Sequence, residues 1–513
     1  MAPATATAPP KTAPPKWAKV IDHTRCIGCH ACTTACKSEN QVPVGVTRTY
    51  VKYVDVGVFP AARRAFQVTR CNQCENAPCV TACPTAAMHR RPDGIVDFDK
   101  SICIGCKACI AACPYDAIFI NPEDHSAEKC NFCAHRLDVG LEPACVVVCP
   151  TEAIMVGDMR DPLSRISSYI QQDAVVVRRP EKETRPKLFY KGAHQATLDP
   201  LAARRPDGGL FMWSEQGDVP HQVTAGHPGG GNSSAAAVVS YDVPHRAPWD
   251  WRVSLYTWTK SIAAGAFLVP ALLGAVGAMS WESPLWRWAM PVMAGAFLAL
   301  TGLLLIWDLE HPKRFLYVLL KPQPRSWLVR GGFIITGYGA VLALLFAGNF
   351  VPLGGAGRWL VVAGVPLAAM TSIYTAFLFA QAKARDLWQS PLLPPHLAVQ
   401  ATMAGAGALI PVAMSMEPEL VAPLAWVLSG STVAHLLMVL GETTLTHVTA
   451  HARLALHEMT RGKYAAFFWG AVVFGTLSLV APWAPLPGAL LGLLGLLAFE
   501  HAYVQAGQAV PLA

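Results

Sequence analysis

The sequence predicts two unlike parts, a small α+β domain rich in cysteine and, after it, an all-α membrane domain of eight helices. Two observations carry this prediction. All sixteen cysteines lie between Cys26 and Cys149, whereas from about Trp249 onward Ala, Leu, Val, Gly and Trp dominate in apolar blocks. A length of 513 residues also favours at least two folded units. We therefore expect a water-soluble half followed by a membrane half.

The chain on either side of the cysteine-rich part is low in complexity. Residues 1–16, MAPATATAPPKTAPPK, lack an apolar core, a twin arginine and an Ala-x-Ala site, so we expect a disordered arm rather than an export signal. A cysteine domain is predicted over 17–165, an extension and linker over 166–248, and the membrane domain over 249–513. Within the linker, GHPGGGNSSAAA is typical of a flexible connection, and LFMWSEQ at 210 fits either a docking patch or a strap.

The cysteines form four groups of four, with none left over. The first and third groups share the compact spacing CxxCxxCxxxC, the second has a wider middle gap, and the fourth has a long one. The last three groups each end in Cys-Pro. The groups are Cys26, Cys29, Cys32 and Cys36; Cys71, Cys74, Cys79 and Cys83; Cys103, Cys106, Cys109 and Cys113; and Cys130, Cys133, Cys145 and Cys149.

This spacing is typical of iron-sulfur clusters. Three thiolates from one tight loop and a fourth from elsewhere hold a [4Fe-4S] cluster, and the cysteine before proline ligates the other cluster of a pair. Sixteen ligands therefore predict four [4Fe-4S] clusters. A disulfide framework is disfavoured because no export signal is expected and neighbouring thiols lie too close to pair. Structural zinc is disfavoured because the third cysteine of a group would have no role in a tetrahedral site.

Three short segments that follow the cysteine groups repeat one unit. CPTAAM at 83, CPYDAI at 113 and CPTEAI at 149 are each expected to leave a short helix, turn at the proline and enter a strand. The repeat predicts a double bacterial-ferredoxin-like domain of the α+β class with short hairpins. Because this part has few large apolar residues, we expect the clusters themselves to hold it together.

The order of the four groups, with the wide gap in the second and the long gap in the fourth, resembles the four-cluster subunit of the dimethyl sulfoxide reductase and polysulfide reductase families. The resemblance implies how the ligands are shared between groups. Cys26, Cys29 and Cys32 would share a cluster with Cys149, and Cys130, Cys133 and Cys145 with Cys36. Likewise Cys71, Cys74 and Cys79 would share a cluster with Cys113, and Cys103, Cys106 and Cys109 with Cys83.

Apolar blocks long enough to span a bilayer, about 20 residues each, follow one another through the second half. Eight such blocks place both ends of this half on the same side of the membrane. They lie near 255–279, 285–307, 327–347, 358–380, 396–415, 421–446, 464–482 and 486–506.

Lys and Arg in the short loops predict the orientation, since these residues are enriched on the cytoplasmic side. The loops on the side of the cysteine domain hold nine of them, and the opposite loops hold two, Arg287 and Arg358. We therefore expect a multi-pass protein of the bacterial inner membrane with its cysteine domain in the cytoplasm. An unsignalled domain ahead of the first span would otherwise have to cross the membrane folded.

Ionisable residues near the ends of the spans are functional candidates because they are costly in lipid. They fall in the half of the bilayer nearest the cysteine domain, with His435 alone nearer the middle. A quinone would suit this place, because it needs hydrogen-bond donors, a proton source and a nearby cluster. The alternative for any single residue is a charged side chain that only reaches the interface. The candidate quinone-binding residues are Lys260, Asp308, His311, Arg330, Tyr374, His396 and Glu442, and Glu500 and His501 lie at a similar depth.

Two segments, WDLEHPKRFLYVLLKPQPRSWLVRGG at 307–332 and LWQSPLLPPH at 387–396, resemble the membrane subunit of polysulfide reductase, the NrfD family. The resemblance covers roughly 250–505 and implies an eight-helix anchor without haem that binds a quinone near the cluster side. The family's tyrosine on the fourth span matches Tyr374, whereas Lys260 on the first span departs from the family pattern. A cytochrome b anchor would need axial histidines at two depths, which the distal half does not supply.

These observations predict an electron-transfer and membrane-anchor subunit that links a separate catalytic subunit to the membrane quinone pool, with menaquinone or ubiquinone as the quinone. The families imply that the partner is a molybdenum or tungsten enzyme with a bis-pterin cofactor. No residue in this chain is expected to convert a substrate, and nucleic-acid binding is not expected because the basic residues are scattered. The alternatives are the equivalent subunit of a nickel-iron hydrogenase and a redox-sensing ion or proton transporter.

Overall fold

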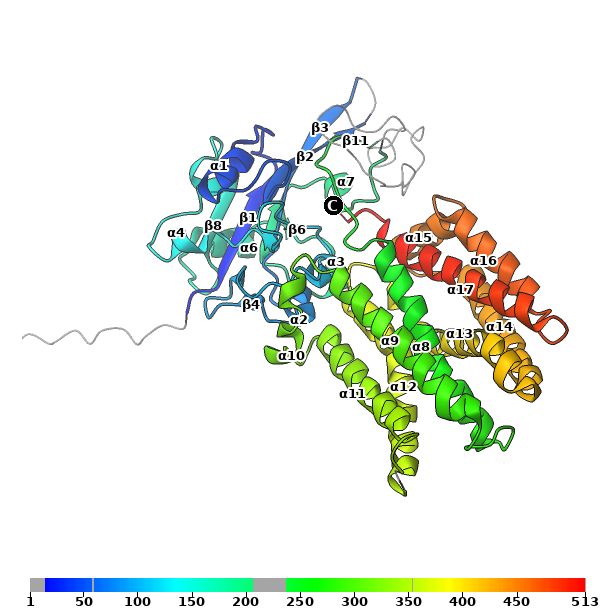
Figure 1. Cartoon of the computed structure of the whole chain (residues 1–513). Coiled ribbons are helices and arrows are strands. Elements are labelled where there is room, and N and C mark those ends of the chain that lie inside the picture. The colour runs from blue at the N-terminus through cyan, green and yellow to red at the C-terminus, as the bar shows by residue number, and fades with distance from the viewer. Residues whose placement is uncertain (1–13, 58–59, 206–236, 353, 513) are drawn as a thin grey trace, which may run out of the picture.

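The computed structural model describes residues 14–57, 60–205, 237–352 and 354–512. LFMWSEQ at 210–216 and nearly all of GHPGGGNSSAAA therefore lie outside the described residues, as does most of the arm over 1–16. Within the described residues the chain forms a cysteine domain of short helices and strands and a membrane domain of long helices (Figure 1).

A four-stranded sheet of order β8-β1-β10-β9 forms one half of the cysteine domain. Strand β1 (Trp17–Asp22) pairs in parallel with β10 (Leu188–Lys191) and antiparallel with β8 (Ile154–Asp158). Alternate side chains of a strand face opposite sides of a sheet. Ala18 and Val20 accordingly pack against Ile166 of helix α6 (Arg165–Gln172), while Ile21 packs with the cysteines of the first and fourth groups.

A second sheet, of order β11-β2-β3, is antiparallel throughout. Its strands are β2 (Thr49–Val56), β3 (Arg63–Arg70) and β11 (Val238–Tyr241). Three strands come from the segment 166–248. They are β9 (Val175–Val176) and β10 of the first sheet and β11 of the second. This segment, which the sequence suggests as an extension and linker, therefore supplies strands to both sheets of the cysteine domain.

The repeated unit after each Cys-Pro has the structure that the sequence predicts. Helices α2 (Pro78–Ala82) and α3 (Ala108–Ala112) are each followed by a short hairpin, β4 (Met88–Arg90) with β5 (Val96–Phe98) and β6 (Ile118–Ile120) with β7 (Ala127–Lys129). The fourth group carries α4 (Ala134–Leu137) and α5 (Ala144–Val147), and the first carries α1 (Ala31–Glu39). The ferredoxin-like α+β class is therefore confirmed.

In the described residues, seven helices are long and apolar enough to cross a membrane, which confirms a multi-pass membrane domain. The seventh predicted span, 464–482, forms only α16 (Ala465–Ser478), whose 14 residues rise about 21 Å, less than the roughly 30 Å of a bilayer core. The count of eight is thus approximate. The seven long helices are α8 (Trp251–Ala275), Leu285–Trp307 containing α9 (Met290–Trp307), α11 (Trp327–Ala347), α12 (Ala356–Gln381), α13 (Leu393–Met416), Pro418–Thr444 containing α14 (Val421–Thr444), and α17 (Pro485–Gln508).

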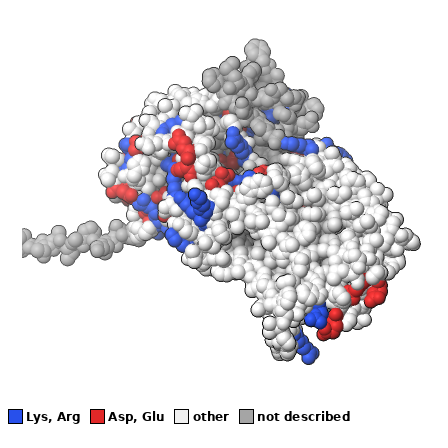
Figure 2. All heavy atoms as spheres, in the orientation of Figure 1, with Lys and Arg blue, Asp and Glu red and all other residues white. Residues whose placement is uncertain are grey.

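The cysteine domain lies on one end of the helical bundle, and its helices α2 and α3 face that end (Figure 1). Short helices α10 (Tyr317–Leu320) and α15 (Ala450–Thr460) lie in loops between the long helices. Figure 2 shows charged residues gathered over the cysteine domain and the adjoining end of the bundle and a smaller group at the far end of the bundle, with almost no charge on the visible surface between. This distribution suits a bundle surrounded by lipid and a domain surrounded by water.

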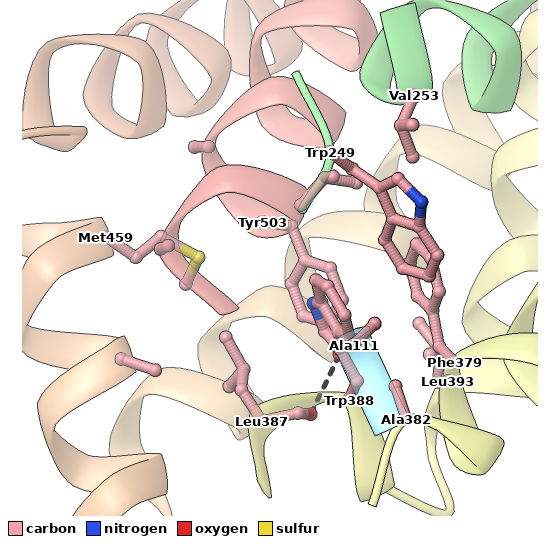
Figure 3. Packing of buried hydrophobic residues seen from close by; sticks show 14 of the residues in the cluster. Ala111, Trp249, Val253, Phe379, Ala382, Leu387, Trp388, Leu393, Met459 and Tyr503 are labelled. Carbon is pink, nitrogen blue, oxygen red and sulfur yellow. Dashed lines mark hydrogen bonds between the residues drawn. The ribbon is translucent and has the colours of Figure 1, made fainter. Parts of the chain in front are cut away.

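The two domains share one hydrophobic core at their junction (Figure 3). The ring of Trp249 lies nearly parallel to those of Phe379 and Trp388, with centroids 6.0 and 5.6 Å away, and these two rings stack on each other at 4.5 Å. Alanines of α2 and α3, including Ala111, belong to the same buried cluster. Because side chains of both domains exclude water together, the junction is a continuous packed interface rather than a flexible tether.

Candidate functional site

Two cavities in the cysteine domain are each lined by four cysteines. In each, three cysteines come from one group and the fourth from a neighbouring group, as the resemblance implied for the second and third groups. Among the described residues no group of three or more Cys, His, Asp or Glu side chains is close enough to hold a single metal ion. In these two places the cysteine sulfurs instead surround a cavity. One cavity is lined by Cys83, Cys103, Cys106 and Cys109, and the other by Cys71, Cys74, Cys79 and Cys113.

The first and fourth groups also meet. The Asn40 side chain reaches both, since its Nδ2 lies 3.6 Å from Cys36 Sγ and 3.7 Å from Cys133 Sγ. Cys26, Cys32 and Cys149 lie together in the core between the two sheets, along with Cys145. The structure therefore brings the first group to the fourth, as the ligand sharing implied by the resemblance would require.

Backbone conformation explains the tight loops that carry the first and third groups. Gly28 and Gly105 have φ of 71° and 69°, and the residues after the second cysteine, His30 and Lys107, have φ of 60° and 61°. The left-handed region favours glycine and bends the chain sharply. The two loops therefore have the same shape, which lets three sulfurs of one loop face a common point.

Several N–H groups approach the cysteine sulfurs. The backbone nitrogens of Gln73, Met88 and Ala153 lie 3.4, 3.3 and 3.2 Å from the sulfurs of Cys71, Cys83 and Cys149. Hydrogen bonds of this kind stabilise negative charge on a thiolate, whether it is free or bound to iron.

Two buried cationic side chains donate hydrogen bonds to the sulfur of Cys145. Arg70 Nη1 donates to Cys145 Sγ at 2.9 Å and Lys19 Nζ at 3.6 Å. Burial alone would raise the pKa of the Cys145 thiol, but the charges of Arg70 and Lys19 lower it to about 7. The surroundings of this sulfur therefore favour negative charge strongly.

The orphaned donors of Arg70 fit a bound anionic group. Arg70 is 1% exposed, and its Nε and Nη2 have no hydrogen-bond partner among the described residues. An unsatisfied buried donor costs on the order of 1–3 kcal/mol. A [4Fe-4S] cluster held by thiolates carries negative charge on its sulfurs, so the residues present fit that group.

The third-group loop lies directly against the membrane domain. The backbone nitrogens of Glu310 and His311 donate to the oxygens of Gly105 and Ile104 at 3.4 and 3.2 Å. A Cβ at Gly105 would lie 2.4 Å from Glu310 Cβ, so only glycine allows this approach. The loop after α9 is therefore placed within contact of the third cysteine group.

Asp308 joins this junction. Lys107, next to Cys106, lies 3.5 Å from Asp308 Oδ1 and 3.1 Å from Glu310 Oε1. The indole nitrogen of Trp249 donates to the Cys106 oxygen at 3.2 Å. His311, a predicted site residue, lies here as well, with its Nε2 3.3 Å from Ser126 Oγ.

Lys260 and Tyr374 are brought together inside the bundle. Lys260 is fully buried, and its ammonium donates to Ser372 O and Thr375 Oγ1, both at 2.8 Å. The same nitrogen lies 5.2 Å from the centroid of the Tyr374 ring. Lys260 is therefore held by groups of α12 rather than reaching the membrane surface.

A second polar group lies between α13, α14 and α17. His396 Nε2 and His435 Nδ1 are 2.8 Å apart, and His396 Nδ1 lies 4.0 Å from Glu442 Oε2. The Phe499 ring lies against both histidines. His396 and Glu442 are thus brought together, with His435 as the third member.

Arg330 lies apart from the other candidate residues. Its side chain is exposed, its Nε donates to Pro324 O at 2.8 Å, and its guanidinium lies 4.9 Å from the Trp327 ring centroid. The sequence indicates the depth of a residue along a helix but not the face it occupies, and Arg330 occupies an outer face.

Sequence reasoning missed several residues of this arrangement. Lys19, Arg70 and Asn40 approach the cysteine sulfurs, and Trp249 joins the two domains. One signal was present, because Arg70 directly precedes Cys71. Glu500, by contrast, was named from the sequence at the depth of the candidate residues, and it lies 3.5 Å from the Ser261 hydroxyl.

Comparison with known families matches both halves of the chain. Residues 23–45 match a 4Fe-4S binding domain and residues 63–159 a 4Fe-4S dicluster domain. Residues 240–486 match the polysulphide reductase, NrfD, family. The cysteine domain is therefore composed of 4Fe-4S binding domains, and the membrane domain is of the NrfD type.

Individual relatives match the first part of the chain. A tetrathionate reductase subunit of Salmonella typhimurium is 44% identical over 208 residues, which is 39% of this chain and 80% of the relative. One of the polysulfide reductase chains of Wolinella succinogenes is 44% identical over 177 residues, 34% of this chain and 93% of the relative. The thiosulfate reductase electron transfer subunit PhsB of Salmonella typhi is 47% identical over 163 residues, 31% of this chain and 84% of the relative. The chain thus belongs to the family of reductase iron-sulfur subunits, here continued by an NrfD-type membrane domain.

Proposed function

We propose that this chain carries electrons, one at a time, through four [4Fe-4S] clusters between a separate catalytic subunit and the membrane quinone pool. One observation carries the proposal: the loop of Cys103, Cys106 and Cys109 is packed against the end of α9, beside Asp308. Clusters supply reversible one-electron transfer when they are bound. A quinone, by contrast, exchanges two electrons and two protons, so the residues at this junction would have to manage protons as well.

The sixteen cysteines are proposed as the ligands of these clusters in the four sets that the resemblance implies. The two cysteine-lined cavities support the sets of Cys83 with the third group and Cys113 with the second. The position of Asn40 between Cys36 and Cys133 supports the exchange between the first and fourth groups. Anaerobically purified protein should contain about sixteen iron atoms per chain, and about eight would contradict the proposal.

The quinone would bind at the end of the bundle that the cysteine domain covers, as menaquinone or ubiquinone, and no haem is proposed. Asp308 and His311 offer a carboxylate and an imidazole beside the third cysteine group. Lys260 and Tyr374 offer an ammonium and a phenol deeper in the bundle, and Glu442 with His396 forms a second buried pair. These groups can hydrogen-bond the quinone carbonyls and accept or donate its protons. Arg330, on an outer face, is not included.

The face around Cys29 is proposed as the docking site of the catalytic subunit. Cys29 is exposed, unlike most of the other cysteines, so electrons can leave the chain there. Ile27 and Val147 nearby in the first and fourth groups are 57% and 62% exposed, which is unusual for apolar side chains and suits an interface. The families imply that this partner holds a molybdenum or tungsten bis-pterin cofactor. Purification of a nickel-iron subunit with this chain would instead support the hydrogenase alternative.

The cysteine domain is proposed to face the cytoplasm of a bacterial inner membrane. The loops on its side contain Lys313, Arg314, Lys383 and Arg385 among other basic residues, which are enriched on the cytoplasmic side of membrane proteins. Protease treatment of right-side-out vesicles should spare residues 1–248, whereas inside-out vesicles should lose them. Loss of this domain from right-side-out vesicles would reverse the orientation.

A further inference from the structure

Three side-chain N–H donors converge on the sulfurs of one proposed ligand set. Lys19 Nζ and Arg70 Nη1 lie 3.6 and 2.9 Å from Cys145 Sγ. Asn40 Nδ2 lies 3.6 Å from Cys36 Sγ and 3.7 Å from Cys133 Sγ, and Arg48 Nη1 fixes this amide by donating to Asn40 Oδ1 at 2.7 Å. By the ligand sharing proposed above, these three cysteines hold the same cluster, together with Cys130.

The two cations of this group are buried and lack a carboxylate partner. Lys19 is 0% exposed and Arg70 is 1% exposed, and neither forms an ion pair with an Asp or Glu in the described parts of the chain. The Lys19 ammonium lies 4.3 Å from the Phe132 ring centroid, and Cys32 and Cys130 are close enough to interact electrostatically with Arg70. A buried charge without compensation is costly. Negative charge on the cysteine sulfurs is what compensates these two cations.

Cations near the other ligand sets are arranged differently. Lys107, next to Cys106, pairs with Asp308 and Glu310. Lys129 interacts electrostatically with Cys71 and Cys79 of another set, but its ammonium donates to the carbonyl oxygens of Val96 and Cys130 rather than to a sulfur. In the described residues, side-chain nitrogens reach a cysteine sulfur only in the set of Cys36, Cys133 and Cys145.

This asymmetry bears on redox potential. When a [4Fe-4S] cluster takes up one electron from a neighbouring cluster, its net negative charge increases by one, the neighbour is oxidised, and no bond is formed or broken. Nearby positive charge and hydrogen bonds to the sulfurs stabilise the reduced form, more strongly in a buried site than in water. A cluster beside two buried cations should therefore be easier to reduce.

We propose that Lys19 and Arg70 raise the reduction potential of the cluster held by Cys36, Cys130, Cys133 and Cys145. Electrons that pass between the partner subunit and the membrane would therefore reside on this cluster more than on its neighbours. Asn40 adds a smaller contribution because its amide is neutral. The inference rests on the proposed function, since it assumes that these cysteines are cluster ligands. The two buried side chains are positioning residues that tune the cluster and do not touch a substrate.

Anaerobic redox titration of the full-length protein, followed by electron paramagnetic resonance, tests this inference. In Lys19→Met and Arg70→Gln, one of the four clusters should show a ratio of reduced to oxidised form at least tenfold lower at a fixed potential, a shift of about 59 mV or more. In Lys19→Met the other three clusters should keep their potentials, whereas in Arg70→Gln the cluster of Cys32, whose sulfur also interacts with Arg70, should shift as well but by less. Lys19→Arg, which retains the charge, should behave like the wild type, and Asn40→Leu should give a smaller shift in the same direction.

Lys52→Met is the matched control. Lys52 is also buried in a strand of the cysteine domain, at 1% exposure, but its ammonium interacts with Asp242 rather than with a cysteine. This variant should leave all cluster potentials unchanged. An equal shift in Lys52→Met and Lys19→Met would overturn the inference, because it would show a general effect of losing a buried lysine.

Iron content separates this inference from the proposed function. A wild-type count near eight would contradict the four-cluster proposal itself, whereas about sixteen irons with unchanged potentials in iron-replete Lys19→Met would overturn only the role of the cations. If Arg70→Gln loses iron, the Lys19 variants still decide the question. Cys145→Ser should alter the spectrum of the same cluster that Lys19→Met shifts, and a change in a different cluster would contradict the assignment.

Discussion

The two halves of this molecule bury polar groups in different ways. In the cysteine domain the core between the hairpins contains the cysteines themselves, such as Cys74, Cys79 and Cys109, with few large apolar residues around them. In the membrane domain the core consists of apolar side chains and close helix contacts, and the polar residues form small separate groups such as Lys260 with Thr375. The first core is incomplete without what its sulfurs bind, while the second is complete as it stands. The two halves should therefore respond differently to the same treatment.

Removal of iron should have the largest effect on stability, and it should affect the two halves differently. Chelation under oxidising conditions is expected to unfold the cysteine domain, because its core depends on the sulfurs being held together. The helices of the membrane domain should persist. Circular dichroism should retain a helical spectrum while protease cuts residues 17–165. Equal protease resistance before and after iron removal would contradict the difference between the two cores.

Substitution of Gly265 should disrupt the membrane domain alone. A Cβ at Gly265 would lie 1.8 Å from the Ala401 oxygen, since α8 and α13 touch backbone to backbone there. Gly265→Val is expected to lower the free energy of unfolding in detergent by about 3 kcal/mol or more. Iron content and cluster spectra should stay normal, as thermal unfolding and iron analysis can check.

Gly295→Ala is the control for this substitution. Nothing lies within 4 Å of the position that a Cβ at Gly295 would occupy. This variant should therefore unfold within about 0.5 kcal/mol of the wild type. A comparable loss of stability in both variants would mean that close packing of α8 on α13 is not what stabilises the bundle.

A buried histidine should make the cysteine domain sensitive to pH. His245 forms ion pairs with Asp116 and with Asp242, the latter at 3.2 Å. Burial lowers the pKa of His245, but the two carboxylates raise it to about 9. Since the folded pKa exceeds the unfolded value of about 6.5, the stabilisation is complete below about pH 6.5. It is lost as pH rises through about 9.

The midpoint temperature of cluster loss, measured from about pH 6.5 to 9.5, can test this. It should fall with pH in the wild type, with a change in stability on the order of 1–3 kcal/mol. His245→Gln should be less stable at the acidic end of this range and should lose most of the pH dependence. A wild-type midpoint that stays level or rises over this range would contradict the assignment of a charged His245.

The junction between the halves should weaken modestly when Lys107 is replaced. Lys107→Met removes the cation that pairs with Asp308 and Glu310, leaving two carboxylates close together. Hydrogen exchange in residues 309–326 is expected to become about tenfold faster, which corresponds to about 1.4 kcal/mol. Lys313→Met, at an exposed position of the same loop, should not change the exchange rate. Equal rates in wild type and Lys107→Met would show that the ion pairs do not hold the junction.

Much of the cysteine domain could be predicted from the sequence because its structure is local. The cysteine spacing and the repeated Cys-Pro unit specify short loops, helices and hairpins within a few residues of one another. The cations beside Cys145 could not be predicted in the same way, since Lys19 and Arg70 lie 126 and 75 residues away from it along the chain. The strand β11 likewise returns to the cysteine domain across a long segment, and only its pairing with β2 reveals it.

In the membrane domain, hydropathy predicted the positions of the helices but not their contacts. The position of a residue within its apolar block indicates its depth in the bilayer, which placed Asp308, Lys260 and Arg330 in the same half. It does not indicate the face of the helix, and Arg330 faces outward while Lys260 faces α12. The sequence also did not indicate that α16 is short, because the apolar block continues through the turns that follow Ser478.

Quinone-dependent oxidation of the clusters tests the central claim most directly. Full-length protein in liposomes would be reduced with dithionite, freed of excess reductant and mixed with a soluble quinone analogue while cluster absorbance is followed. The wild type should be oxidised rapidly, and Lys260→Met and Asp308→Asn should be oxidised at least tenfold more slowly with about sixteen irons still bound. Arg330→Gln, on the outer face, should match the wild type. Equal oxidation rates in all four iron-replete proteins would contradict a quinone site at the junction of the two domains.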